Sequence, residues 1–137
     1  MTALRPEAPP ARVENPPAAR ETAAPAEPAV RDETVVLSIL QRYEAAYSNL
    51  DATAASAVWP AVDRSALARA FNGLASQRVS LGDCDISVNG PSARATCSGS
   101  ATWRPKVGGG SHTENRRWNF ELRKAGENWK IERAVIR

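Results

Sequence analysis

Residues 84–97 read CDISVNGPSARATC, and this stretch carries both cysteines of the 137-residue chain. Apolar residues alternate on each side of NGPS, a pattern typical of two strands joined by a turn. With Gly90 and Pro91 at the centre of the turn, Cys84 faces Cys97 on the neighbouring strand. Opposed residues of paired strands lie close enough for a disulfide. We therefore expect a disulfide on the inner face of this hairpin, with two buried reduced thiols as the alternative.

The strand before the turn changes phase. Val79 and Leu81 alternate in one phase, whereas Cys84 begins the other, so a β-bulge at Gly82 and Asp83 would absorb the extra residue. The strand after the turn has small residues on its inner face, and they leave room for either a ligand cavity or a close-packed helix. These small residues are Ala93, Ala95, Gly99 and Ala101.

Three helices are predicted before the strands. The first has an apolar stripe at three- and four-residue steps and is expected to begin at a cap on Asp32. Asp51 is expected to cap a short second helix, which ends at Trp59 because proline follows it. The third is expected to begin at Asp63 and to stop at Gly73. The stripe of the first helix comprises Val36, Ile39, Leu40, Tyr43, Ala46, Tyr47 and Leu50.

A second hairpin follows the glycine-rich loop KVGGGSHT, with KAGEN as its turn. Its alternation places Trp118, Phe120 and Leu122 inward on one strand, with Trp129 and Ile131 on the next. The same phase predicts that Arg133 points inward opposite Trp118, where it would either stack on the indole or recognise an anionic ligand. Helices followed by paired strands predict an α+β domain, in which three helices cover one face of a curved, mostly antiparallel sheet of about four strands.

The first 32 residues contain most of the ten prolines and almost no large apolar residues. We interpret residues 1–32 as a disordered linker and residues 33–137 as one folded domain. The net charge is +3 and bases are interspersed with acids, so nucleic-acid binding is not expected. No apolar run is long enough to insert into a membrane. His112 is the only histidine and C-x-x-C is absent, so neither a metal nor a cofactor is expected.

The segments LQRYEAAYSNLD (40–51) and WNFELRKAGENWKIERAVI (118–136) resemble the first helix and the closing hairpin of the nuclear transport factor 2-like (SnoaL-like) superfamily. The segment LDATAASAVWP, the cysteine hairpin and the proline-rich leader are similar to C-terminal modules of bacterial membrane-anchored proteins, including serine/threonine kinases. The resemblance implies a cone whose sheet curls around the helices, often with a pocket and often dimerising. Enzymes of the superfamily place acids, histidines or tyrosines inside the cone.

The inward positions of this chain are nearly all apolar or small, and no pair of acid and base is predicted among them. We therefore expect a non-catalytic ligand-binding or sensory module for a small apolar or anionic ligand. The alternatives are an interaction or homodimerisation module with a filled cone, and a small isomerase-, dehydratase- or hydrolase-like enzyme. An oxidising, extracytoplasmic location would follow from the disulfide. The candidate pocket residues are Tyr43, Tyr47, Trp59, Trp103, Trp118 and Arg133.

Overall fold

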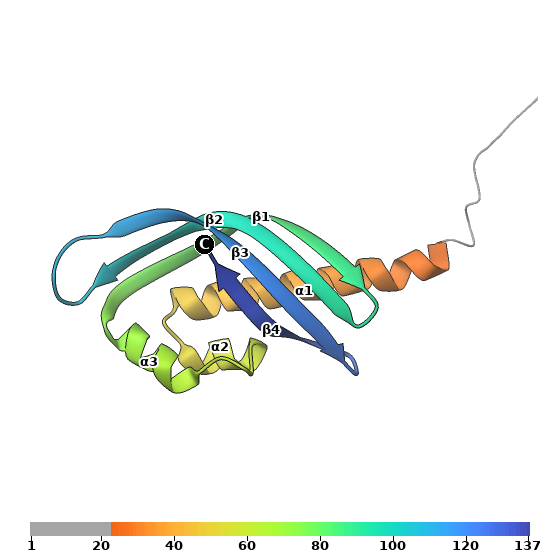
Figure 1. Cartoon of the computed structure of the whole chain (residues 1–137), viewed down its shortest axis with the longest axis horizontal. Coiled ribbons are helices and arrows are strands. Elements are labelled where there is room, and N and C mark those ends of the chain that lie inside the picture. Colours follow the sequence, from red (N-terminus) through yellow and green to blue (C-terminus); the bar gives the residue numbers. More distant parts are fainter. Residues whose placement is uncertain (1–22) are drawn as a thin grey trace, which may run out of the picture. The chain divides into compact units, whose positions relative to one another are not determined.

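The computed structural model describes residues 23–137, with side chains from Arg31 onward. Contacts separate Met1–Asp32 from Glu33–Arg137, and most of the predicted linker lies outside the described residues. Three helices precede four strands, and in the second unit the helices lie against one face of a curved sheet (Figure 1). The elements are α1 (Ala23–Ser48), α2 (Ala52–Val58), α3 (Arg64–Asn72), β1 (Leu74–Asn89), β2 (Ser92–Pro105), β3 (His112–Ala125) and β4 (Asn128–Ile136).

The two short helices begin at the predicted aspartate caps and end at the predicted residues. Asp51 accepts a hydrogen bond from the Ala54 amide (2.9 Å) at the start of α2, which ends at Trp59. Asp63 caps α3 in the same way, through the Ala66 amide at 3.0 Å. The predicted cap at Asp32 is wrong, because α1 already begins at Ala23. The helix continues upstream through Pro25 and Pro28, although proline disfavours a helix interior, so Asp32 lies within α1 and does not cap it.

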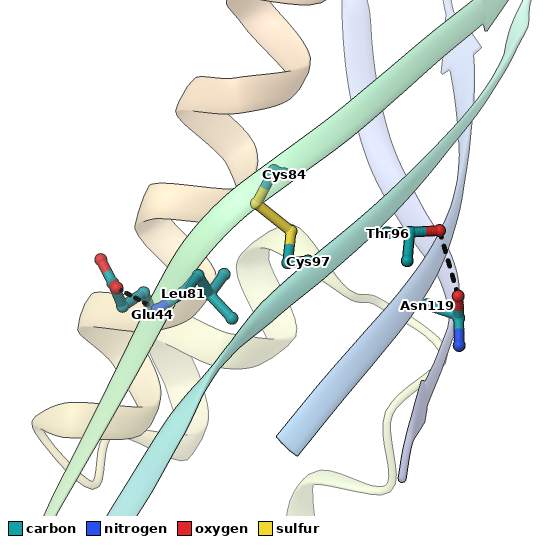
Figure 2. The surroundings of a disulfide bond; sticks show 6 residues. All are labelled: Glu44, Leu81, Cys84, Thr96, Cys97 and Asn119. Atoms are coloured by element: carbon teal, nitrogen blue, oxygen red, sulfur yellow. Dashed lines mark hydrogen bonds between the residues drawn. A yellow bond between two sulfur atoms is a disulfide. The ribbon is translucent and has the colours of Figure 1, made fainter. Parts of the chain in front are cut away.

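The cysteine hairpin has the predicted register. Val88 pairs with Ala93 and Cys84 with Cys97, and the strands shift by one residue between Leu81 and Cys84. The disulfide joins Cys84 and Cys97, whose Cα atoms are 4.0 Å apart. Figure 2 shows this bond between β1 and β2 on the side of the sheet that faces α1. The bulge at Gly82 and Asp83 therefore lets both halves of β1 present apolar residues to the same core.

Small residues on β2 lie opposite large residues on β3 throughout the inner face. Ala95 pairs with Phe120, and Cys97 pairs with Trp118. Both aromatic side chains are almost completely buried. The room that the small β2 residues leave is thus taken largely by the neighbouring strand. The sheet order is β1-β2-β3-β4 and every pairing is antiparallel, as expected for an α+β domain of this kind.

The predicted register of the second hairpin is wrong. Ala125 pairs with Asn128 across a two-residue turn at Gly126 and Glu127, in which Gly126 has the positive φ of 63° that such turns use. The register of β3 and β4 also shifts by one residue after the pair Leu122–Ile131. The next pair is Glu121 with Arg133, so Glu132 is the extra residue on β4. Arg133 is consequently exposed on the outer face and does not meet Trp118.

Polar side chains of α1 bind the outer edge of β1. The Glu44 carboxylate accepts a hydrogen bond from the Leu81 amide at 2.7 Å (Figure 2). Ser48 Oγ accepts from the Val79 amide (2.9 Å) and donates to the Val79 carbonyl (3.3 Å). Unpaired backbone groups on an edge strand invite pairing with another chain. These bonds occupy such groups on β1, and they also fix α1 against the sheet.

We expect removal of the disulfide to lower stability without changing the fold. In the chain-entropy description, a loop this short contributes about 2–3 kcal/mol when it is closed. The double substitution Cys84→Ala/Cys97→Ala should therefore lower the free energy of unfolding by about this amount in urea denaturation. Reductant should destabilise the unmodified chain and leave the double variant unchanged. Two free thiols in the unreduced, denatured chain would contradict the assignment.

A glycine is required at position 99, where the backbone of β2 lies against that of β1. A Cβ atom on Gly99 would clash with the Ser80 carbonyl oxygen, a backbone atom that cannot move independently. Gly99→Ala should destabilise the domain by about 1–3 kcal/mol, as overpacking does. Gly110→Ala is the matched control, because nothing lies within 4 Å of its Cβ position. Equal midpoints for both variants in thermal unfolding would refute this close approach.

Candidate functional site

A pocket of about 380 Å³ opens between α1 and the inner face of the sheet. The tyrosines come from one helical face, four residues apart, and Trp118 and Arg116 come from alternate positions of β3. Trp103 belongs to β2, near the end of the long β2–β3 hairpin. The lining residues are Tyr43, Tyr47, Leu74, Gln77, Val79, Ala101, Trp103, Arg116, Trp118 and Ile136.

Aromatic contacts hold the two tyrosines in place. Their rings stack with centroids 4.3 Å apart. Tyr43 also meets the edge of Phe120 (5.0 Å), and Tyr47 meets Phe71 of α3 (5.4 Å). Such pairs add about 0.5–1.5 kcal/mol each beyond area burial. The aromatic wall of the pocket is therefore preorganised by α1, α3 and β3 together.

The Tyr43 hydroxyl is buried and has no hydrogen-bond partner among residues 31–137. Burial, with a smaller contribution from Tyr47, raises the pKa of Tyr43 well above its ordinary value. Burial also raises the pKa of Tyr47. Both groups are thus protonated at neutral pH. Burying a hydroxyl without a partner is unfavourable, so this group lowers the stability of the folded state.

Arg116 supplies the positive charge of the pocket. It lies two residues before Trp118, in the inward phase of β3, and pairs across the sheet with Gly99, which has no side chain to obstruct it. Its guanidinium forms an ion pair with the carboxylate of Glu114. Both partners are partly exposed, so a bound anion can compete with Glu114 for the guanidinium.

The structure brings together four of the six predicted pocket residues: Tyr43, Tyr47, Trp103 and Trp118. Trp59 does not line the pocket and instead packs against the core at the end of α2, with its indole nitrogen buried. Arg133 lies on the opposite face for the reason given above. Arg116 also lines the pocket, although it is not among the six residues predicted from the sequence. The alternation that ends in Trp118, Phe120 and Leu122 extends back to it and would have identified it.

No group of three potential metal ligands occurs among the residues whose placement is described. His112 is exposed and stacks on Trp103 with ring centroids 5.5 Å apart. Within residues 23–137, none of the helices combines the length and apolar character that crossing a bilayer requires.

Tyr43 should make stability depend on pH in alkaline solution. Above pH of about 10, the ordinary tyrosine pKa, the unfolded chain loses this proton while the folded chain retains it. The free energy of unfolding should then fall by up to about 1.4 kcal/mol per pH unit on account of this group. Tyr43→Phe should remove this part of the slope, and it should cost little at pH 7 because the hydroxyl has no described partner.

Urea denaturation between pH 7 and pH 11 measures this effect. Tyr47→Phe is the control, since that tyrosine is less buried and should account for a smaller part of the slope. Parallel stability curves for the unmodified chain and Tyr43→Phe would show that Tyr43 ionises normally in the folded state.

No protein-family model and no curated protein sequence matches the chain. Solved structures do resemble it. A protein from Streptomyces avermitilis, provisionally named a dehydratase of the NTF2-like family, has a TM-score of 0.68 at 16% identity over 77% of this chain and 95% of its own. An NTF2-like protein from Novosphingobium aromaticivorans, described as having a cystatin-like fold, has a TM-score of 0.67 at 19% identity, covering 88% and 90%.

The LinA-type3 hexachlorocyclohexane dehydrochlorinase of Novosphingobium barchaimii has a TM-score of 0.67 at 7% identity, covering 79% of this chain and 86% of its own. At such identities the likeness concerns the course of the backbone and carries no information on activity. The three helices, the four-stranded antiparallel sheet and these structural neighbours together show that the chain has the nuclear transport factor 2-like fold.

Proposed function

We propose that this domain binds a small molecule with a flat apolar body and an anionic group, without transforming it chemically. The observation that carries the proposal is the combination, in one pocket, of an aromatic wall and the single cation Arg116. Small-molecule sites are usually apolar concavities of about 300–1,000 Å³ with a few polar groups that fix orientation. The pocket matches that description in volume and in composition.

The polar groups of the pocket suggest how the ligand is oriented. Trp103, which is half-buried, offers ring surface for the apolar body, and Arg116 can form charge-assisted hydrogen bonds with a carboxylate or sulfonate. The anionic group is therefore expected at the Arg116 side of the pocket, with the apolar body toward the tyrosines.

The ionisable side chains that line the pocket favour binding over acid–base catalysis. They are Tyr43, Tyr47 and Arg116, with no carboxylate or imidazole in the described lining. A general base must accept a proton near the working pH. Raised tyrosine pKa values and a permanently charged guanidinium do not provide one. The dehydratase and dehydrochlorinase among the structural neighbours share the fold, and fold alone does not transfer their chemistry.

We further propose that the module acts outside the cytoplasm as a sensory domain. The Cys84–Cys97 disulfide supports an oxidising compartment. In this arrangement residues 1–32 would serve as the tether to a membrane-anchored protein, as the resemblance to kinase C-terminal modules suggests. Ligand occupancy would then be the signal that the module reports.

The binding test uses naphthalene-1-carboxylate and, as its neutral counterpart, naphthalene-1-carboxamide. Quenching of tryptophan fluorescence should show saturable binding of both, with the carboxylate bound more tightly. Arg116→Gln should weaken carboxylate binding by about tenfold and leave carboxamide binding nearly unchanged, since one charge-assisted bond contributes about 1.5–3 kcal/mol. Arg104→Gln is the matched control, because this exposed arginine of β2 lines neither the aromatic pocket nor the hollow on the outer face.

Two results would overturn the proposal. If Arg116→Gln and Arg104→Gln have the same effect on carboxylate binding, the interaction is general attraction to a basic protein. If neither probe binds and the domain sediments as a dimer, the fold serves as an interaction module instead. If the protein converts the bound carboxylate to a product, and Tyr43→Phe abolishes this conversion, the enzyme alternative is favoured.

A further inference from the structure

A second hollow, of about 940 Å³, lies on the outer face of the sheet. Its lining carries polar and charged side chains and no aromatic ring, in contrast to the pocket on the inner face. Most of the strand residues that line it have outward phase on β2 and β3, with the β1 bulge at one side and the end of β4 at the other, and Arg116 of the inner pocket lines it as well. The principal lining residues are Asp83, Thr96, Ser98, Arg117, Asn119 and Arg137.

Two arginines lie directly opposite each other in this hollow. The Arg117 amide donates to the Arg137 carbonyl (3.0 Å), and the Arg137 amide donates to the Arg117 carbonyl (2.9 Å). This reciprocal pair places both side chains next to each other on the same face. Like charges at directly opposed positions destabilise a sheet.

No carboxylate of the described residues forms an ion pair with either arginine. Other cations of β3 do have such partners, since Arg116 pairs with Glu114 and Arg123 pairs with Glu132. The Arg117–Arg137 pair therefore combines two positive charges whose repulsion an external anion would relieve. The phosphate or sulfate group matches this arrangement, because several oxygens can accept hydrogen bonds from two guanidinium forks at once.

Neutral hydrogen-bonding groups surround the arginines. Ser98 is the direct cross-strand neighbour of Arg117. In the next row, Thr96 Oγ1 donates to Asn119 Oδ1 at 3.1 Å, which leaves the Asn119 amide group free to donate outward (Figure 2). Asp83 is the acidic residue of the lining and belongs to the β1 bulge, at the side of the sheet away from β4. An anion is therefore expected between β3 and β4, not near the bulge.

We propose that the outer face binds a tetrahedral oxyanion, a phosphate or sulfate group, between Arg117 and Arg137, with Ser98 and Asn119 as additional donors. Arg116 lines both hollows, but the oxyanion site is centred on Arg117 and Arg137, which do not line the aromatic pocket, and it does not depend on the function proposed for that pocket. A second copy of the chain is a poorer occupant, because a two-fold contact centred on this pair would set the same four arginine side chains against one another.

The test is titration of the domain with inorganic phosphate, and separately with inorganic sulfate, at constant ionic strength maintained with chloride. Two-dimensional NMR should show saturable shifts in the amides of Ser98, Arg117 and Asn119. Arg117→Gln and Arg137→Gln should each weaken binding by about tenfold or more, the loss expected for charge-assisted bonds. Arg104→Gln is the control, because this exposed arginine of β2 does not line the hollow.

Trp103→Ala, which alters the inner pocket, should leave oxyanion binding unchanged. This variant therefore tests the oxyanion site separately from the function proposed for the inner pocket. Binding of phosphate but not sulfate, or the reverse, identifies the group and supports the site. Absence of saturable shifts, or equal losses in Arg117→Gln and Arg104→Gln, would overturn it. A change from dimer to monomer in Arg117→Gln, seen by sedimentation, would show that this face joins two copies.

Discussion

The bulge at Gly82 and Asp83 is the constraint on which the rest of the domain depends. Without it, the two halves of β1 would present their apolar residues to opposite faces of the sheet. With it, Val79 and Cys84 both face the helices, and Cys84 meets Cys97 in a disulfide. The separate pairing of β2 with β3 aligns the small residues of β2 with large ones of β3. The core, and hence the inner pocket, depends on both registers.

The inner pocket exists because packing around this core is incomplete at one end of the sheet. Toward the β1–β2 turn, the large residues of β3 fill the space over the alanines of β2. At the other end Gly99 and Ala101 lie opposite the charged residues Arg116 and Glu114, which pair with each other and do not fill the interior. The space left at this end is the inner pocket. Tyr43 and Trp118 belong to its lining, and so does the cation Arg116.

The two faces of the sheet thus offer two different kinds of recognition. Adjacent arginines of β3 belong to different faces, since successive side chains of a strand point in opposite directions. Arg116 lines the aromatic pocket and also the outer hollow, whereas Arg117 and Arg137 line the outer hollow and not the aromatic pocket. The two proposed ligands would therefore be bound on opposite faces of one sheet. Occupancy of either surface can be measured separately.

The sequence by itself determined the elements whose signals are local: the caps at Asp51 and Asp63, and the first hairpin with its disulfide. It did not determine where α1 begins, because Pro25 and Pro28 upstream of Asp32 favour a break that the helix does not make. It also did not reveal the irregularity beyond Ile131, since no glycine marks it and only packing of β4 against β3 decides it. That irregularity placed Arg133 outside, and the tertiary structure alone assigned the pocket cation to Arg116.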